Sequence, residues 1–297
     1  MYGFTCAFAL YLPAKINLRT YSLRIAVCIV LSIPFAGIAQ QYRKVTLEKP
    51  SAAELERIDH IKAIPPEKFE AGTFTGNSGI SIRYRLLRPP TVVKENYPLV
   101  VVFHGSGAIG NNNTSQVGFI AKSWADSAMQ QRFPAFVLVP QFPERSSNYS
   151  MDDKRKTLTS RVQPPVYAVM ELIDSIKKVL PVDTNRIYLQ GFSMGASTVL
   201  NALTIRPGLF AAGIAFGGIP DFSAQETLSK VPLWLLHGNA DQENFITGDS
   251  LFYHEMKKRK AKRLRYWELD GFPHELPLGL ISDGVFAEWL FGKKKRS

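Results

Sequence analysis

The chain has 297 residues, of which 45% are apolar and 21% are charged, and its formal net charge is +11. This balance excludes a disordered chain, and the length allows a core that can stabilise a domain without disulfides. Many of the cations lie in Lys257–Arg263 and Lys293–Arg296, where no aromatic residues alternate with them, so we expect a solvated surface and no nucleic-acid partner.

The first 39 residues differ from the rest of the chain. They contain three basic residues and no acidic residue, followed by an apolar run over Ile25–Phe35 and the small-residue pattern Gly37-Ile38-Ala39. This order is typical of a secretory signal peptide, and the apolar run is short for a bilayer span and is interrupted by Pro34. We predict that residues 1–39 are removed and that the protein is exported, periplasmic or secreted, without stable membrane insertion; an uncleaved membrane anchor is the alternative.

Both cysteines, Cys6 and Cys28, lie within this N-terminal segment. The mature chain would therefore have no cysteine nucleophile, no thiolate metal site and no disulfide. No linker or internal repeat divides the remainder, so we expect residues 40–297 to form a single domain.

Strand-like and helix-like segments alternate along this domain. We predict strands at Ile80–Leu87, Leu99–Phe103, Ala135–Pro140, Arg186–Gln190, Ala211–Phe216, Val231–Leu236 and Leu264–Leu269. We predict helices at Ser51–Ile64, Ser115–Gln131, Pro164–Val179, Met194–Leu203, Ser250–Lys260 and Leu278–Leu290. Such alternation predicts an α/β fold with a mostly parallel central sheet and helices on both faces. The stretch Phe142–Pro165 shows no regular pattern, and we expect residues 143–165 to be a lid or a substrate-facing insertion.

The pentapeptide Gly191-Phe192-Ser193-Met194-Gly195 matches G-x-S-x-G at the junction of a predicted strand and a predicted helix. A sharp turn at such a junction holds the serine in a strained conformation and presents its hydroxyl at the carboxyl edge of the sheet. Gly191 and Gly195 would let the neighbouring backbone approach closely. We predict that Ser193 is a nucleophile.

A nucleophilic serine needs a base, and the chain has five histidines. His60 and His254 lie on predicted helices and should face solvent, whereas His104 and His237 each end a buried strand. His274 lies between the last predicted strand and the last predicted helix, where sheets with this serine turn carry the base. We predict His274 as the base, with a structural loop histidine as the alternative.

The acid should follow the penultimate strand, and Asp241 lies a few residues past that strand. Its carboxylate would accept the Nδ1–H of the base, fix the tautomer and stabilise the imidazolium. Glu243, Asp249 and Asp270 are the rivals for this role.

The segment His104-Gly105-Ser106-Gly107 follows a buried strand and is similar to loops that offer a backbone N–H to an oxyanion. We predict the N–H groups of Ser106 and Met194 as the two donors, with His104 and Gly105 supporting the loop.

The segment Gly105–Gly110 also matches the dinucleotide fingerprint G-x-G-x-x-G. Asparagines follow it where a helix should begin, and no acidic residue ends a second strand about twenty residues later. No H-E-x-x-H or other metal-ligand spacing is present. We therefore expect neither a cofactor nor a metal.

With these motifs the chain resembles the α/β-hydrolase esterases, and more narrowly the secreted feruloyl-esterase, polyhydroxybutyrate-depolymerase-like and phospholipase/carboxylesterase group. The resemblance covers roughly residues 80–292 and lies in YPLVVVFHGSG, FVLVPQFP, NRIYLQGFSMGA, LFAAGIAFGG, VPLWLLHGNAD, GFPHE and FAEWLF. It implies a triad of Ser193, Asp241 and His274, and oxyanion donors at Ser106 and Met194. The chain departs from the family pattern at Gln242–Phe245, Glu275–Pro277 and Ser197, which bears on the substrate pocket.

The resemblance and the motifs predict a serine carboxylic-ester hydrolase that works through a covalent acyl-enzyme. Its substrates would be small-molecule or polymer-linked esters, such as acylated polysaccharides or aryl esters. An exported serine peptidase of the prolyl-oligopeptidase type and a non-catalytic binding protein with this fold are the alternatives. The binding protein would be expected to lack a triad member, and none is missing.

Overall fold

The computed structural model describes residues 42–90 and 96–295. The predicted signal peptide and both cysteines lie outside these described residues. No helix in the two ranges is long and apolar enough to cross a bilayer.

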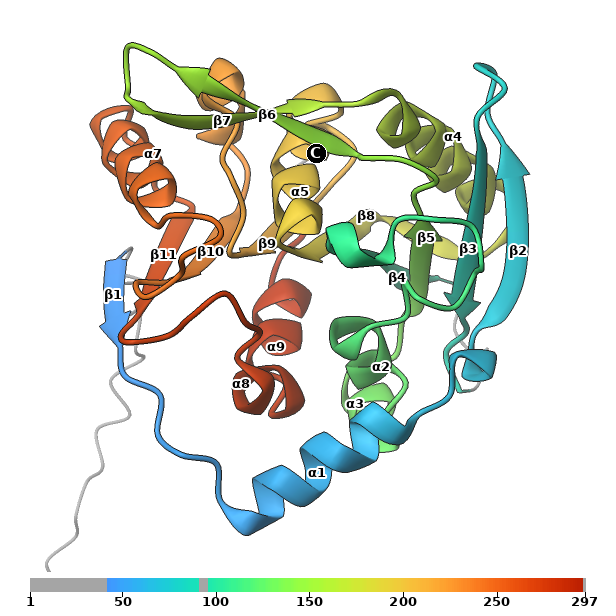
Figure 1. Cartoon of the computed structure of the whole chain (residues 1–297). Helices are drawn as coiled ribbons and strands as arrows, with labels where there is room; N and C mark the ends of the chain where they lie inside the picture. The colour runs from blue at the N-terminus through green and yellow to red at the C-terminus, as the bar shows by residue number, and fades with distance from the viewer. Residues whose placement is uncertain (1–41, 91–95, 296–297) are drawn as a thin grey trace, which may run out of the picture. The chain divides into compact units, whose positions relative to one another are not determined.

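A mostly parallel sheet forms the centre of the described domain (Figure 1). Its nine described strands follow the spatial order β1-β11-β10-β9-β8-β4-β5-β3-β2. β3 runs antiparallel to both of its neighbours, β5 and β2, and the other described pairs are parallel. These strands are β1 (Tyr42–Val45), β2 (Glu70–Thr75), β3 (Ser81–Leu87), β4 (Tyr97–Phe103), β5 (Phe136–Gln141), β8 (Val182–Phe192), β9 (Ala212–Phe216), β10 (Leu233–Gly238) and β11 (Leu264–Leu269). The predicted α/β architecture is confirmed.

Helices cover both faces of the sheet (Figure 1). One face carries α4 (Pro164–Val179), α5 (Met194–Ile205), α6 (Gln225–Leu228) and α7 (Thr247–Lys258). The other carries α2 (Phe119–Trp124), α3 (Ser127–Arg132), α8 (Leu278–Ser282) and α9 (Val285–Phe291), and α1 (Ala52–Ala63) packs on α2 and α8. Short 3-10 helices occur at η1 (Pro66–Lys68), η2 (Ser106–Ala108) and η3 (Phe222–Ala224).

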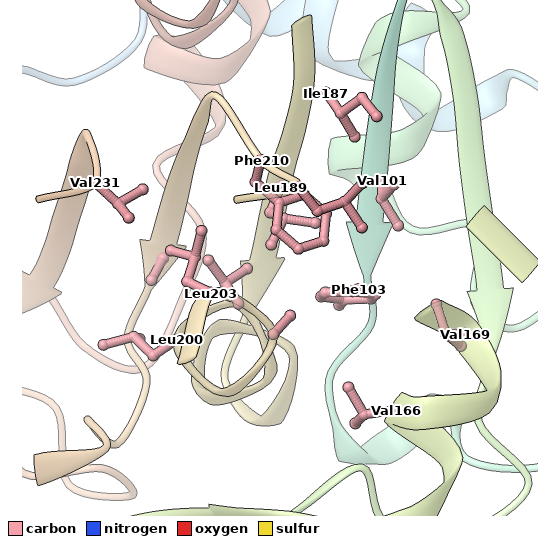
Figure 2. Packing of buried hydrophobic residues seen from close by; sticks show 14 of the residues in the cluster. Val101, Phe103, Val166, Val169, Ile187, Leu189, Leu200, Leu203, Phe210 and Val231 are labelled. Carbon is pink, nitrogen blue, oxygen red and sulfur yellow. The ribbon is translucent and has the colours of Figure 1, made fainter. Parts of the chain in front are cut away.

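The buried strands supply two hydrophobic clusters, one on each face. On β4, Val101 and Phe103 pack in the cluster beneath α4 and α5, whereas Val102 packs in the opposite cluster. Figure 2 shows the first cluster, to which α4 contributes Val166 and α5 contributes Leu200. Because successive side chains of a strand point to opposite faces, filling both clusters requires an uninterrupted apolar strand. This is why the central strands were predictable.

Two predicted helices are each divided in the structure. The segment 115–131 forms α2 and α3, because the Asp126 side chain accepts the N–H groups of Ala128 and Met129, each at 3.1 Å, and starts a new helix. The segment 278–290 forms α8 and α9, which are separated by Gly284 at a φ of 81°. In both places a local cap overrides a continuous apolar periodicity.

The stretch 142–165 contains an antiparallel hairpin, β6 (Ser147–Asp152) and β7 (Thr157–Val162), so the expectation of no regular structure was wrong. The hairpin crosses above α5 (Figure 1) and is attached to it by polar contacts. Ser146 Oγ lies 2.7 Å from Thr198 Oγ1, and Ser147 Oγ donates to Asn201 Oδ1 at 2.8 Å. A strand that packs through hydroxyl and amide groups lacks the apolar alternation by which strands are recognised.

Candidate active site

Ser193 lies at the turn between β8 and α5. Its φ of 56° and ψ of −120° are unusual for a residue with a side chain, and such strain clusters at functional positions. The turn is held by the Ser193 N–H, which donates to the Phe216 carbonyl on β9 at 2.9 Å. Ser193 therefore has the conformation predicted for a strained nucleophile turn.

Gly191 and Gly195 make this turn possible. A Cβ on Gly195 would overlap with the carbonyl groups of Phe103 and His104, and one on Gly191 would overlap with the Gly195 carbonyl. All of these neighbours are backbone atoms, which cannot rotate away as a flexible side chain can. Gly195 thus allows the start of α5 to lie directly against the end of β4, and Gly191 allows it to lie against the end of β8.

The structure brings Ser193, His274 and Asp241 together from the ends of three different strands. His274 Nε2 lies 2.9 Å from Ser193 Oγ, and His274 Nδ1 lies 2.6 Å from Asp241 Oδ2. The imidazole also packs on Phe192, with the ring centroids 4.8 Å apart. The three predicted residues therefore form a continuous hydrogen-bonded line.

Asp241 is buried and accepts several hydrogen bonds. Its Oδ1 accepts the N–H groups of Glu243 and Asn244 at 2.9 and 2.8 Å. Burial alone would raise the pKa of Asp241, but hydrogen bonds from His237, from His274 and from these amides outweigh it and hold the pKa well below its usual range. The Asp241 carboxylate is therefore ionised at any pH at which His274 is neutral and can accept the proton of Ser193.

The three rival acids have other partners. Glu243 is 75% exposed and reaches His274 Nε2 only at 3.8 Å. Asp270 pairs with Lys44 at 2.8 Å and accepts from Asn239, and Asp249 pairs with His237. Among the described residues, only Asp241 is placed to accept the Nδ1–H of His274.

His237 is a buried neighbour of Asp241 that the motif analysis had set aside. Its Nδ1 lies 2.8 Å from Asp249 Oδ2, and its Nε2 lies 2.6 Å from the Asn244 carbonyl and 3.2 Å from Asp241 Oδ2. Burial alone would lower the pKa of His237, but hydrogen bonds to Asp241 and Asp249 outweigh it and raise the pKa to about 10. The spacing of His237 and Asp241 across a tight turn was the signal in the sequence that could have found this contact.

The raised pKa of His237 makes the stability of the fold depend on pH. A group whose pKa is higher in the folded protein stabilises the fold below its unfolded pKa, and the contribution is lost as the pH rises through the folded pKa. We expect the free energy of unfolding to decrease between about pH 6.5 and about pH 10. Urea unfolding at a series of pH values measures this, and H237Q should flatten the dependence; an equal slope in H237Q would contradict the assignment.

The predicted oxyanion donors each begin a helix. Ser106 is the first residue of η2 and Met194 is the first residue of α5, and the first N–H groups of a helix have no acceptor within it. Both residues line the same cleft as Ser193. Ser106 and Met194 thus each have a backbone N–H group available beside Ser193.

His104 and Gly105 hold the loop that carries Ser106. His104 Nδ1 lies 2.7 Å from the Gly105 carbonyl, and its Nε2 accepts the Phe142 N–H at 3.0 Å. Burial lowers the pKa of His104, although its hydrogen bond to Gly105 opposes the effect. The ring connects this loop to Phe142, which directly follows β5.

A cleft of about 580 Å³ opens over Ser193 and is partly walled by the β6–β7 hairpin and the segment before it. The hairpin side contributes Arg145, Asn148, Tyr149 and Leu158, and the opposite side contributes Ser106, Met194, Glu243 and Asn244. The Tyr149 hydroxyl lies 3.3 Å from Ser197 Oγ on α5. Apart from Met194 and Leu158, this cleft is lined by polar side chains.

A second pocket, of about 220 Å³, lies beyond the Ser106 loop and is mainly apolar. Gly105 and Phe192 line it from the side of Ser193, and Phe119, Ile120 and Leu276 line it from α2 and the loop before α8. Within the described ranges no group of three or more His, Cys, Asp or Glu side chains is arranged to hold a metal ion.

Comparisons with known proteins agree with this fold. A family model described as "Putative esterase" matches residues 77–273, which include Ser193 and Asp241 and end just before His274. A bifunctional acetylxylan esterase/xylanase from Neocallimastix patriciarum is 29% identical over 152 residues, 51% of this chain and 20% of that protein.

Solved structures extend the comparison. A thermostable esterase is similar with a TM-score of 0.69 and 31% identity, over 77% of this chain and 64% of that chain. A ferulic acid esterase from Anaeromyces mucronatus, solved with ferulic acid, has a TM-score of 0.51 and 17% identity over 74% of this chain and 88% of that chain, which shows the fold alone. The chain spans a fifth of the curated relative and just under two thirds of the thermostable esterase. Since the family match covers well over half of the chain, the protein belongs to this esterase family and has an α/β-hydrolase fold.

Proposed function

We propose that the protein hydrolyses carboxylic esters through a covalent acyl-enzyme on Ser193. The observation that carries this proposal is the line of contacts from Ser193 Oγ to His274 at 2.9 Å and from His274 to Asp241 at 2.6 Å. His274 Nε2 takes the hydroxyl proton as Ser193 Oγ bonds to the ester carbonyl carbon. The ester C–O bond then breaks, and the departing alcohol takes the proton from His274.

The second half of the reaction repeats these steps with water. His274 takes a proton from the water as its oxygen bonds to the acyl carbon, and the acid leaves as Ser193 Oγ regains the proton. In both halves the negative carbonyl oxygen would accept the N–H groups of Ser106 and Met194. Donors of this kind are fixed before the reaction begins, and losing one costs about 3 kcal/mol of activation free energy.

The two pockets beside Ser193 favour a substrate with one polar and one apolar part. Ser106, Asn148, Tyr149 and Asn244 offer hydrogen-bonding groups to a hydroxyl-rich alcohol, whereas the second pocket suits an apolar acyl or aryl group. The name of the similar acetylxylan esterase supports an acylated polysaccharide, and an aryl ester would also suit the apolar pocket. The export that we propose for the chain would bring it to such a polymer.

Replacing Ser193 with alanine tests this proposal. The wild type is expected to hydrolyse p-nitrophenyl acetate, a feruloyl ester or acetylated xylan, and Ser193→Ala to lower kcat by about 10⁴- to 10⁶-fold, as removal of a nucleophilic serine does in other hydrolases. Ser78→Ala, an exposed serine in the turn between β2 and β3, is the matched control and should retain wild-type kcat.

Other outcomes would redirect the assignment. A folded wild type that hydrolyses none of these esters and is not labelled at Ser193 by an organophosphonate would contradict the proposal and favour a binding role. Cleavage of peptide p-nitroanilides in preference to esters would instead identify a peptidase. The preference among acetyl, butyryl and feruloyl esters measures the size of the acyl pocket.

A further inference from the structure

Two buried histidines next to the site have different sets of hydrogen-bonding partners. The ring of His104 has a carbonyl at Nδ1 and an N–H donor at Nε2, as expected for a neutral imidazole. His237 has a carboxylate at Nδ1 and a carbonyl at Nε2, with a second carboxylate 3.2 Å from Nε2. A carbonyl cannot donate, so Nε2 must carry a proton, and an ionised Asp249 requires one on Nδ1 as well. The contacts of His237 are those of an imidazolium.

Asp249 lies between the start of a helix and the buried rings of His237 and Tyr266. Asp249 lies in the first turn of α7, where the helix dipole stabilises negative charge. Tyr266, on β11, faces it, and burial together with the negative charge of Asp249 raises the pKa of that phenol. Asp241 and Asp249 are thus the ionisable groups that contact His237, and Tyr266 is a further neutral neighbour.

Asp241 Oδ2 is shared between two histidines. It lies 2.6 Å from His274 Nδ1 and 3.2 Å from His237 Nε2, while Oδ1 accepts two backbone N–H groups. The carboxylate is therefore restrained at both oxygens. The backbone holds one oxygen, and His237 contacts the oxygen that receives the proton-bearing Nδ1 of His274.

We propose that His237 is a positioning residue whose imidazolium holds Asp241 toward His274 and connects it to Asp249. This inference rests on the proposed esterase function. The line of contacts then runs Ser193, His274, Asp241, His237, Asp249. Three of its contacts are hydrogen bonds, and the contact between Asp241 and His237 is an ion pair at 3.2 Å, because the Nε2–H of His237 is directed at the Asn244 carbonyl. Asp241, His237 and Asp249 together carry one negative charge, which balances the positive charge that forms on His274 when Ser193 gives up its proton.

A variant series separates this role from a structural one. H237Q keeps a hydrogen-bond donor but removes the positive charge, and we expect kcat on p-nitrophenyl acetate to fall about 10- to 100-fold with KM within twofold, the effect of one charge-assisted hydrogen bond. H237Q leaves Asp249 without its partner, so Tm should also fall. H254Q, at an exposed histidine on α7, is the matched control and should retain wild-type kcat and Tm.

The double variant H237Q/D249N gives the decisive comparison. It removes the buried unpaired carboxylate, so Tm should return toward the wild-type value while kcat stays low, because Asp241 still lacks its second histidine. If kcat recovers together with Tm, His237 serves only as a counter-ion for Asp249 and the proposal is overturned. Wild-type kcat in folded H237Q would overturn it as well.

The charge on His237 can be measured in the full-length wild type, independently of any ester. In ¹⁵N-histidine NMR spectra at pH 8 we expect two protonated ring nitrogens for one buried histidine, with that signal missing in H237Q or in H237N should H237Q not fold. A neutral tautomer at His237 would overturn the proposal. If the wild type hydrolyses no ester but shows the doubly protonated ring, the proposed function fails while the charge bridge stands.

Discussion

Replacing Asp241 with asparagine is expected to lower kcat/KM for p-nitrophenyl acetate by about 10⁴-fold, the size of effect seen when a triad acid becomes an amide. The Glu243 and Asn244 N–H groups would hold the amide oxygen at the Oδ1 position, so the amide nitrogen would face His274. Nδ1 would then have to accept, which places the imidazole proton on Nε2. A protonated Nε2 in a neutral ring cannot take the proton of Ser193.

Steady-state kinetics of the folded variant measure this effect, with circular dichroism as the check on folding. Glu243→Gln and Asp270→Asn are the matched controls, because both carboxylates are exposed and neither accepts from Nδ1 of His274. We expect both controls to stay within a few fold of wild type. Near-normal activity in Asp241→Asn together with a large loss in Glu243→Gln would transfer the role of acid to Glu243.

Replacing Gly195 with alanine is expected to destabilise the fold by about 3 kcal/mol or more and to abolish esterase activity. The added methyl group would overlap with the Phe103 and His104 carbonyls, and relief requires α5 to move away from β4. Since α5 begins directly after Ser193, the same movement displaces the nucleophile and the Met194 N–H. Urea unfolding gives the free energy, and the ester assay gives the activity.

Gly208→Ala is the control for this prediction. Gly208 is exposed, and a Cβ there would meet no atom within 4 Å. The change should therefore alter the free energy of unfolding by less than about 0.5 kcal/mol. Equal stabilities for the two variants would mean that α5 is free to shift, against the close contact at β4.

The fold could be predicted where both faces of a strand are buried. β4 is buried along its whole length and β5 is apolar from Phe136 to Pro140, so their residue types alone indicate a covered parallel sheet. The edge strands β1 and β2 are largely exposed and polar, and β1 pairs with β11, more than two hundred residues away in the chain. The pairing of β1 depends on the completed sheet, and β2 has few apolar residues, so the local pattern indicated neither strand.

The residues of the candidate site also differ in whether the sequence could predict them. Ser193 and His274 follow from the serine turn and from the chain order of loops at one edge of a sheet. The Asp249 contact could not be predicted, because Asp249 belongs to α7 and meets His237 only when that helix packs on the sheet. In the sequence, Asp249 is also an ordinary acidic residue in the first turn of a helix, where a negative charge interacts favourably with the helix dipole. Its presence there did not require a contact with the site.

The attachment of the β6–β7 hairpin to α5 has a kinetic meaning. Ser146 and Ser147 bond to Thr198 and Asn201, which lie on the helix that begins directly after Ser193, so these hydrogen bonds link the hairpin to the helix that carries the nucleophile. Enzymes with hinged covers spend part of each turnover opening and closing. Because the β6–β7 hairpin is bonded to the helix that follows the nucleophile, we expect substrates to enter a cleft over Ser193 that is already open. We expect progress curves of ester hydrolysis to show no lag. We also expect the selectivity between esters to be set when the substrate first enters the cleft.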